Sequence, residues 1–238
     1  MSSQHIIIVG GSSGIGLATA RHLLASGSQV TITGRNETRL IEARRQLGPN
    51  AQIALMDASA ADALPAQFAR IGKFDHLVLA LGSSRGVGHF SNVSLADVKL
   101  GFEEKVYAHF ATAQAALPFL NPTGSIIFVS GLAAQAAIPG TAGIGAANAA
   151  VAALVPILAV ELKPLRVNGV SPGVIDTPWW DAVPEEQKQV MFKEFGAKNP
   201  VGRVGRPEDV AQAIAFLISN TFMTGHMVTC DGGQRLSP

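Results

Sequence analysis

A glycine-rich turn near the start of the chain has residue types and a spacing that could do chemistry. Gly10, Gly14 and Gly16 follow the apolar run His5–Val9 and open a helical pattern. Gly10 permits a tight exit from a strand, Gly14 lets the backbone approach a pyrophosphate, and Gly16 allows close helix packing. The N–H groups at the start of the helix would point at the anion.

The spacing of these glycines, Gly-x3-Gly-x-Gly, differs from Gly-x-Gly-x-x-Gly, the common dinucleotide pattern. A purely structural strand-to-helix turn is the alternative. The turn therefore predicts a nucleotide phosphate site whose other members are Ser12, Ser13 and Ile15.

The end of the second apolar run indicates which nucleotide such a site would take. A carboxylate at this point would hydrogen-bond the ribose hydroxyls of NAD and repel a phosphate. Here the residues are Arg35 and Asn36. An arginine offers bidentate, charge-assisted hydrogen bonds to a 2′-phosphate, and Ser12 could add a hydroxyl. The sequence favours NADP(H); the alternative is that Arg35 is only a solvated loop residue.

Short β-branched runs alternate with longer helical stretches along the chain, a pattern typical of repeated βαβ units and a parallel sheet. Most of the runs are apolar without alternation, as expected for strands covered by helices on both faces. The predicted strands are His5–Val9, Gln29–Thr33, Gln52–Met56, His76–Leu81, Ser125–Ser130, Arg166–Val170 and His226–Cys230. The predicted helices are Gly14–Ala25, Glu37–Leu47, Asp62–Ile71, Leu95–Leu120, Gly140–Leu162 and Glu208–Ser219. We expect one α/β domain over residues 1–238, a doubly wound Rossmann-type fold with a seven-stranded parallel sheet.

The stretch 174–204 is the one long connection, and it is long enough to form a substrate lid with its own short helices. It carries Trp179 and Trp180 directly after Pro178. These aromatic rings could cover a bound ligand, or they could anchor the segment against the core.

Composition excludes several classes of protein. The 238 residues are 47% hydrophobic, enough for one sizeable core, and 18 basic against 17 acidic residues give a net charge of +1. Since no basic run stands out, neither nucleic acid nor a membrane is an expected partner. A single cysteine, Cys230, cannot form an internal disulfide and lacks partners for a zinc site, so no metal is expected. The start of the chain shows no signal peptide pattern, and the predicted location is the cytoplasm.

Several ordered segments together resemble the short-chain dehydrogenase/reductase family, from His5 to Gly233. The segments that carry the resemblance are Gly10–Gly16, Asp57, Gln114–Pro118, Arg166–Gly173 with Thr177, Gly205–Ala211, Thr224-Gly225 and Asp231–Gly233. The resemblance implies that Asp57 and Ala58 flank the adenine and that Ala80 and Gly82 line the adenosine side. It also implies that Ile175 and Thr177 hold the nicotinamide carboxamide, in a segment with Pro172 and Gly173.

The sequence departs from this family at the positions where the family has its catalytic residues. The family's Tyr-x3-Lys pair falls on Ile144 and Asn148, its serine on Gly131 and its helix asparagine on Lys105. In the family mechanism the tyrosine hydroxyl moves the proton, and the lysine lowers its pKa from about 10. Ile144 can do neither. General acid–base catalysis is worth about 10² to 10⁴-fold in rate, whereas the hydride belongs to the cofactor.

Lys105 and Asn148 are the candidate catalytic residues that remain. Lys105 would restore a proton donor and a positive charge near the substrate; the alternative is a solvent-facing helix residue paired with Glu103 or Glu104. Asn148 can hydrogen-bond a ribose hydroxyl of the cofactor, or it is an ordinary polar helix residue. Ser130 is next to Gly131, but neighbouring strand residues point to opposite faces, so we expect only a strand-end hydrogen bond from it.

Other polar and aromatic residues are weaker candidates. Tyr107 lies on a different side of its helix from Lys105, where packing or an interface is expected. His89 sits in a glycine-rich loop, where a solvated histidine is the expected interpretation.

Two functions follow from these residues. One is an atypical NADP(H)-dependent oxidoreductase acting on a small organic molecule, with Lys105, water or the substrate itself in place of the tyrosine. The other is a catalytically inactive NADP(H)-binding pseudoenzyme that serves as a sensor or scaffold subunit. The family resemblance also implies a homodimer or homotetramer that pairs through the helices at Leu95–Leu120 and Gly140–Leu162. The alanines of the second helix would permit close approach.

Overall fold

The computed structural model describes residues 4–236, and its centre is a seven-stranded parallel sheet. The strands are β1 (His5–Val9), β2 (Gln29–Gly34), β3 (Ala51–Leu55), β4 (Phe74–Leu79), β5 (Leu120–Val129), β6 (Arg166–Pro172) and β7 (Met227–Cys230). Their order in the sheet is β3-β2-β1-β4-β5-β6-β7, and each neighbouring pair is parallel. The expected doubly wound α/β fold is confirmed, because the chain builds outward from β1 in one direction and then from β4 in the other.

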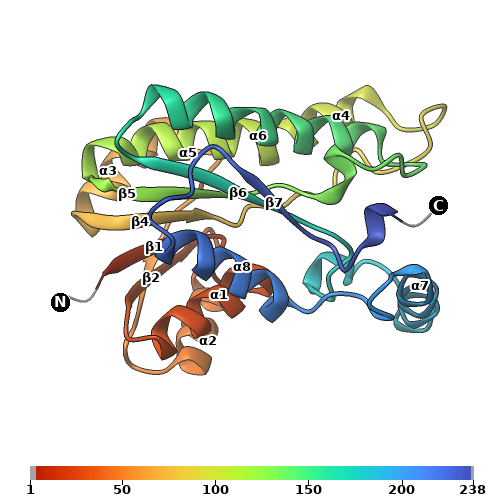
Figure 1. Ribbon diagram of the computed structural model, residues 1–238, viewed down its shortest axis with the longest axis horizontal. Helices are drawn as coiled ribbons and strands as arrows, with labels where there is room; N and C mark the ends of the chain where they lie inside the picture. The colour runs from red at the N-terminus through yellow and green to blue at the C-terminus, as the bar shows by residue number, and fades with distance from the viewer. Residues whose placement is uncertain (1–3, 237–238) are drawn as a thin grey trace.

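Helices cover both faces of the sheet (Figure 1). One layer contains α1 (Gly14–Ala25), α2 (Glu37–Leu47) and α8 (Pro207–Ser219). The other contains α3 (Leu64–Ile71), α4 (Leu95–Phe102), α5 (Ala108–Ala116) and α6 (Ala142–Glu161). The remaining long helix, α7 (Glu185–Lys198), stands apart from both layers in Figure 1. Pro207 opens α8, where its missing N–H costs nothing.

The apolar strands fill two cores because successive side chains point to opposite faces. In β1, Ile7 and Val9 pack into the core under α5 and α6, whereas Ile6 and Ile8 pack into the core under α1 and α8. All four side chains are at most 1% exposed. A strand with helices on both sides therefore needs an uninterrupted apolar run, as the sequence shows.

The main differences from the predicted elements lie between residues 74 and 129. β4 runs from Phe74 to Leu79, two residues earlier at each end than predicted, so Ala80 and Leu81 belong to the loop above the sheet. β5 begins at Leu120, and its register against β4 shifts before Ser125. The predicted helix Leu95–Leu120 is divided by a π-helical turn at Glu103–Tyr107. Hydrophobic periodicity does not predict such a turn, because it inserts one extra residue into an otherwise regular helix.

Within the described residues, α6 is the one helix long and apolar enough to cross a membrane by length and composition. This is weak evidence, since a helix that packs on a sheet passes the same test. Here one side of α6 contributes Val151 and Val155 to the core, while Ile157 and Val160 on its outer side are 58% and 73% exposed.

Candidate functional site

The candidate site lies at the carboxyl ends of the strands, around the neighbouring strands β1 and β4 at the middle of the sheet. Ligands in open α/β sheets bind at this point because the chain leaves neighbouring strands in opposite directions. The two strand ends are in close contact: the Ala80 N–H donates to Val9 O at 2.9 Å. Gly10 has φ = 82°, and a Cβ there would lie 2.6 Å from Ala80 O. Only glycine satisfies both conditions, which explains the first glycine of the turn.

The turn after β1 fits a phosphate group. Gly14 has φ = 50°, and a Cβ at Gly16 would collide with the backbone carbonyl of Gly10, so α1 packs directly on the turn. The N-cap residue Ser13 makes no side-chain hydrogen bond to the helix, and the first turn of α1 has no acidic residue. The N–H groups and the positive end of the helix dipole are thus left for an external anion.

The residues predicted for the adenosine half lie at the ends of β2 and β3. Arg35 is exposed directly after β2, and the Ser12 hydroxyl lies 3.4 Å from the position of a Cβ at Gly34. Asn36 caps α2 by accepting a hydrogen bond from Arg39 N at 2.9 Å. Its side-chain oxygen is therefore already used, and only its amide N–H groups remain for a ligand.

Asp57 and Ala58 follow β3 on the same side of the crevice. Asp57 accepts hydrogen bonds from the Ser59 hydroxyl and amide, at 2.7 and 3.0 Å. These bonds lower the pKa of the Asp57 carboxyl, with a smaller contribution from the positive charge of Arg35. Arg35 and Asp57 consequently lie close enough to act on the same end of a nucleotide. Ala58 is buried.

The segment that follows β6 closes over the phosphate turn. A Cβ at Gly14 would lie 3.3 Å from the Thr177 side chain. Ile175 forms an isolated parallel bridge with Gly205, so the two ends of the 174–204 segment are held together. Pro172 ends β6, and Gly173 packs against Asp231 and Gln234. Thr177 thus lies beside the turn after β1, Ile175 packs in the core next to Gly205, and Gly82, after β4, is exposed. The predicted contacts of these residues with a nicotinamide stay a prediction.

Lys105 lies at the floor of the crevice. Its side chain is 5% exposed, and its ammonium donates to Leu81 O and Val129 O at 2.9 Å and to Ser130 O at 3.3 Å. Each of its three N–H groups therefore has a carbonyl acceptor. The alternative of a solvent-facing lysine paired with Glu103 or Glu104 is wrong, because this side chain is buried and its ammonium is bonded to backbone carbonyls. Burial lowers the pKa of Lys105 to about 7.

Two further residues support this floor and were not singled out from the sequence. His109, fully buried on α5, lies with Nδ1 2.6 Å from Lys105 O and Nε2 3.2 Å from Leu79 O. Glu104 accepts a hydrogen bond from the Ser83 hydroxyl at 2.6 Å. The spacing of four between Lys105 and His109 was the available signal, but it fits an ordinary helix equally well. Burial and the charge of Lys105 lower the pKa of His109 to about 3.

Gly131, Ile144 and Asn148 lie together on the β5 and α6 side of the crevice, and none carries a hydroxyl group. A Cβ at Gly131 would lie 2.8 Å from Asn148 Nδ2, so the Asn148 amide occupies the space beside Gly131. Ser130 donates its hydroxyl proton to the Asn148 carbonyl at 2.8 Å, a strand-end hydrogen bond as expected. Among the side chains of Gly131, Ile144 and Asn148, the Asn148 amide is the single polar group, and none can act as a general acid.

The two tryptophans fix the 174–204 segment in place. Trp180 packs edge-on against Trp179 and Phe192, with ring centroids 4.7 and 5.6 Å apart, and donates to Ile175 O at 3.1 Å. The Trp179 indole N–H donates to Ser83 O at 2.9 Å, across the crevice. Trp180 therefore anchors the segment, whereas Trp179 links the segment to the loop after β4. The helix in this segment, α7, has 14 residues, whereas only short helices were expected there.

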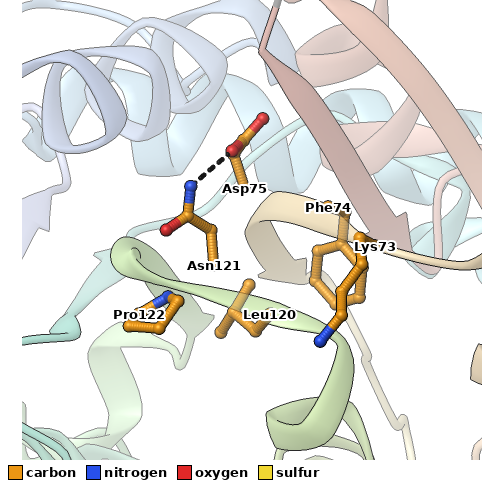
Figure 2. A pocket seen from close by; sticks show the side chains of 6 residues that line it. All are labelled: Lys73, Phe74, Asp75, Leu120, Asn121 and Pro122. Atoms are coloured by element: carbon orange, nitrogen blue, oxygen red, sulfur yellow. Dashed lines mark hydrogen bonds between the residues drawn. The ribbon is translucent and has the colours of Figure 1, made fainter.

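The remaining candidates from the sequence do not join the site. Tyr107 is 62% exposed on the outer side of the π-helical turn, and His89 is exposed in its loop. A depression of about 450 Å³ lies at the opposite end of the sheet, before β4 and at the start of β5 (Figure 2). Its polar contact is a 3.0 Å hydrogen bond from Asn121 to Asp75. Among the described residues, no group of three metal-ligating side chains is found.

Comparison with known proteins agrees with this geometry. Residues 9–235 match the family model described as "Enoyl-(Acyl carrier protein) reductase". The chain is 33% identical to the short-chain dehydrogenase/reductase ATR9 of Stachybotrys chlorohalonatus, over 98% of this chain and 97% of that protein. The chain belongs to the short-chain dehydrogenase/reductase family. It is thus an oxidoreductase by family, as the sequence predicts.

Other relatives and solved structures fit this assignment. The chain is 30% identical to the 3-oxoacyl-[acyl-carrier-protein] reductase FabG of Rickettsia bellii, over 98% of both proteins. A crystal structure of a small-chain dehydrogenase in complex with NADPH superposes with a TM-score of 0.87 at 30% identity, covering 99% of this chain and 100% of the other.

Proposed function

We propose that this protein is an NADP(H)-dependent oxidoreductase that transfers hydride to or from a small organic substrate with a non-standard set of acid–base residues. The observation that carries the cofactor is the uncapped start of α1 beside Ser12 and the exposed Arg35. Backbone N–H groups would hold the pyrophosphate, and Arg35 and Ser12 would hold a 2′-phosphate. The nicotinamide cofactor, when bound, supplies or accepts the hydride.

The residues of the floor explain why we propose non-standard chemistry. If the family's catalytic positions fall on Gly131, Ile144 and Asn148, none of these three positions has a hydroxyl to protonate a carbonyl oxygen. Lys105 brings a positive charge to the floor of the crevice, but all its N–H groups are bonded to carbonyls. The chain itself would then position the substrate and exclude water, with Trp179 closing one side. Substrates that need little protonation by the protein, such as iminium ions, which become neutral amines on accepting hydride, and conjugated alkenes, suit this site better than simple ketones.

Titration with NADPH and NADH, followed by nucleotide fluorescence, tests the cofactor. We expect NADPH to bind more tightly, and failure of both to bind would refute the proposal. Stopped-flow oxidation of bound NADPH against carbonyls, imines and activated alkenes then tests the reaction. We expect turnover with the last two classes.

A catalytically inactive NADP(H)-binding subunit is the second candidate. The specific observation in its favour is the same saturated ammonium at Lys105, because a group with no free N–H cannot act as a proton donor without first breaking a hydrogen bond. Binding of NADPH without turnover across the whole panel would favour this function.

We also propose that the protein forms a homodimer or homotetramer through the outer face of α6. Ala146, Ala149 and Ala153 are exposed there, in line with Ile157 and Val160. Small residues let helices approach closely, and a second copy would cover the apolar side chains. Light scattering should give a mass of two or four chains, and Ala149→Arg should reduce it. A monomeric wild-type protein, or one that partitions into lipid vesicles, would contradict this proposal.

A further inference from the structure

If a dinucleotide binds across the carboxyl ends of the strands, its nicotinamide end lies near Lys105. This inference rests on the proposed function. The phosphate turn lies above β1, and Arg35 and Asp57 lie beyond β2 and β3 on one side. If the adenosine half extends toward those residues, the nicotinamide half extends the other way, over β4 and β5. The ammonium of Lys105 is bonded to carbonyls at those two strand ends.

Lys105 can act at this place through its charge but not through a hydrogen bond. Its three N–H groups already have carbonyl acceptors, so none is directed at a ligand. No carboxylate contributes to its pKa, which burial alone lowers. A buried positive charge without a counter-ion has a field that solvent screens poorly.

The charged and titratable groups around Lys105 do not cancel this charge. On its own helical run, Glu103 is exposed and Glu104 is hydrogen-bonded to Ser83. From α5 it faces His109, whose pKa is lowered to about 3 and which is therefore neutral near pH 7. β4 and β5 contribute backbone carbonyls, and Asn148 on α6 is neutral.

We propose that Lys105 makes this crevice select the reduced cofactor over the oxidised one. The oxidised nicotinamide ring carries one positive charge more than the reduced ring, and the rest of the molecule is identical. A fixed ammonium at the floor therefore raises the free energy of bound NADP⁺ and leaves NADPH nearly unaffected. The same charge would favour a substrate that develops negative charge as it accepts hydride.

The test is the ratio of the two dissociation constants, Kd of NADP⁺ over Kd of NADPH, measured by calorimetry. In Lys105→Met we expect this ratio to fall on the order of tenfold, the size expected for two unit charges about 10 Å apart at an effective dielectric constant of about 20. Lys73→Met removes the same charge at the other end of β4 and should leave the ratio unchanged. An unchanged ratio in Lys105→Met would overturn the inference.

A second readout uses the wild-type protein and does not depend on a variant that folds. The ratio should decrease several-fold from pH 6 to pH 9 as Lys105 loses its proton, since its pKa lies at about 7. Titration of the 2′-phosphate cancels because both cofactors carry it. A ratio that is constant with pH would contradict the inference even if both cofactors bind. If neither binds to the wild-type protein, the proposed function fails as well, so the two failures are distinguishable.

Discussion

The two halves of the crevice are built from different groups. On the β1 side, the phosphate turn consists of glycines and backbone N–H groups, and its geometry is enforced by contacts such as Gly10 on Ala80 O. On the β4 to β6 side, the floor consists of two buried polar side chains, Lys105 in the π-helical turn and His109 on α5. Backbone geometry tolerates few replacements, whereas a side-chain site can change residue by residue. The non-standard acid–base chemistry that we propose would therefore concern the side-chain half of the crevice and leave the backbone half as it is in the family.

Substitution of a glycine in the phosphate turn should have the largest effect. Gly10→Ala places a Cβ 2.6 Å from Ala80 O in a positive-φ conformation, so we expect a loss of about 3 kcal/mol or more in unfolding free energy and no measurable NADPH binding. Urea denaturation and fluorescence titration measure both. Gly48→Ala is the control: its φ is also positive, at 92°, but nothing lies within 4 Å. It should cost about 1 kcal/mol and leave binding intact. Equal effects of the two changes would contradict the proposed role of the contact.

Acid should destabilise the folded protein through two buried histidines, His76 on β4 and His109 on α5. Burial lowers the pKa of His76 to about 4 and of His109 to about 3, below the value of about 6.5 in the unfolded chain. Between the folded and unfolded pKa values the unfolded chain binds more protons than the folded one. The free energy of unfolding therefore decreases as the pH falls from about 6.5 toward 4, by about 3 kcal/mol for His76. Urea denaturation across this range measures the decrease.

A variant pair sharpens this prediction. His76→Gln keeps a hydrogen-bonding group for Ser125, its 2.9 Å partner, and should reduce the pH dependence. His22→Gln changes an exposed histidine on α1 and should not. If both variants keep the full acid dependence, the buried imidazoles are not its cause.

Removal of the charge at the end of β2 should affect one cofactor and not the other. Arg35→Ala loses charge-assisted hydrogen bonds to a 2′-phosphate, so we expect NADPH to bind about 10 to 100-fold more weakly. NADH binding should change less than about twofold, since it lacks that phosphate. Arg44→Ala, an exposed change in the last turn of α2, serves as the control. Equal losses for both cofactors would refute the phosphate assignment.

The smallest expected effect is a coupling between two residues of the altered half. Gly131→Ala brings a Cβ to 2.8 Å from Asn148 Nδ2, a flexible side-chain end that can shift, so the cost should be about 1 kcal/mol. The cost should vanish when Asn148 is also changed to Ala. A double-mutant cycle in urea measures this coupling, expected at about 0.5 to 1 kcal/mol. Additive effects would show that the contact carries no energy.

The seven-stranded sheet, most element boundaries and the glycine turn after β1 can be predicted from the amino-acid sequence. These features depend on short-range rules: apolar runs for buried strands, glycine where φ is positive, and an arginine at the end of β2. The predicted helices Gly14–Ala25 and Glu37–Leu47 agree with the structure at both ends, because turn residues and helix periodicity mark them directly.

The arrangement of side chains around Lys105 could not be predicted from the sequence, because it depends on contacts between distant segments. The orientation of Lys105 depends on a π-helical turn and on carbonyls at Leu81, Val129 and Ser130, which lie far from it in the sequence. The contact between Gly131 and Asn148 and the support from His109 likewise join separate segments. A side chain's exposure and hydrogen bonds are set by whatever packs against it, so no local pattern distinguishes a buried ammonium from one in water.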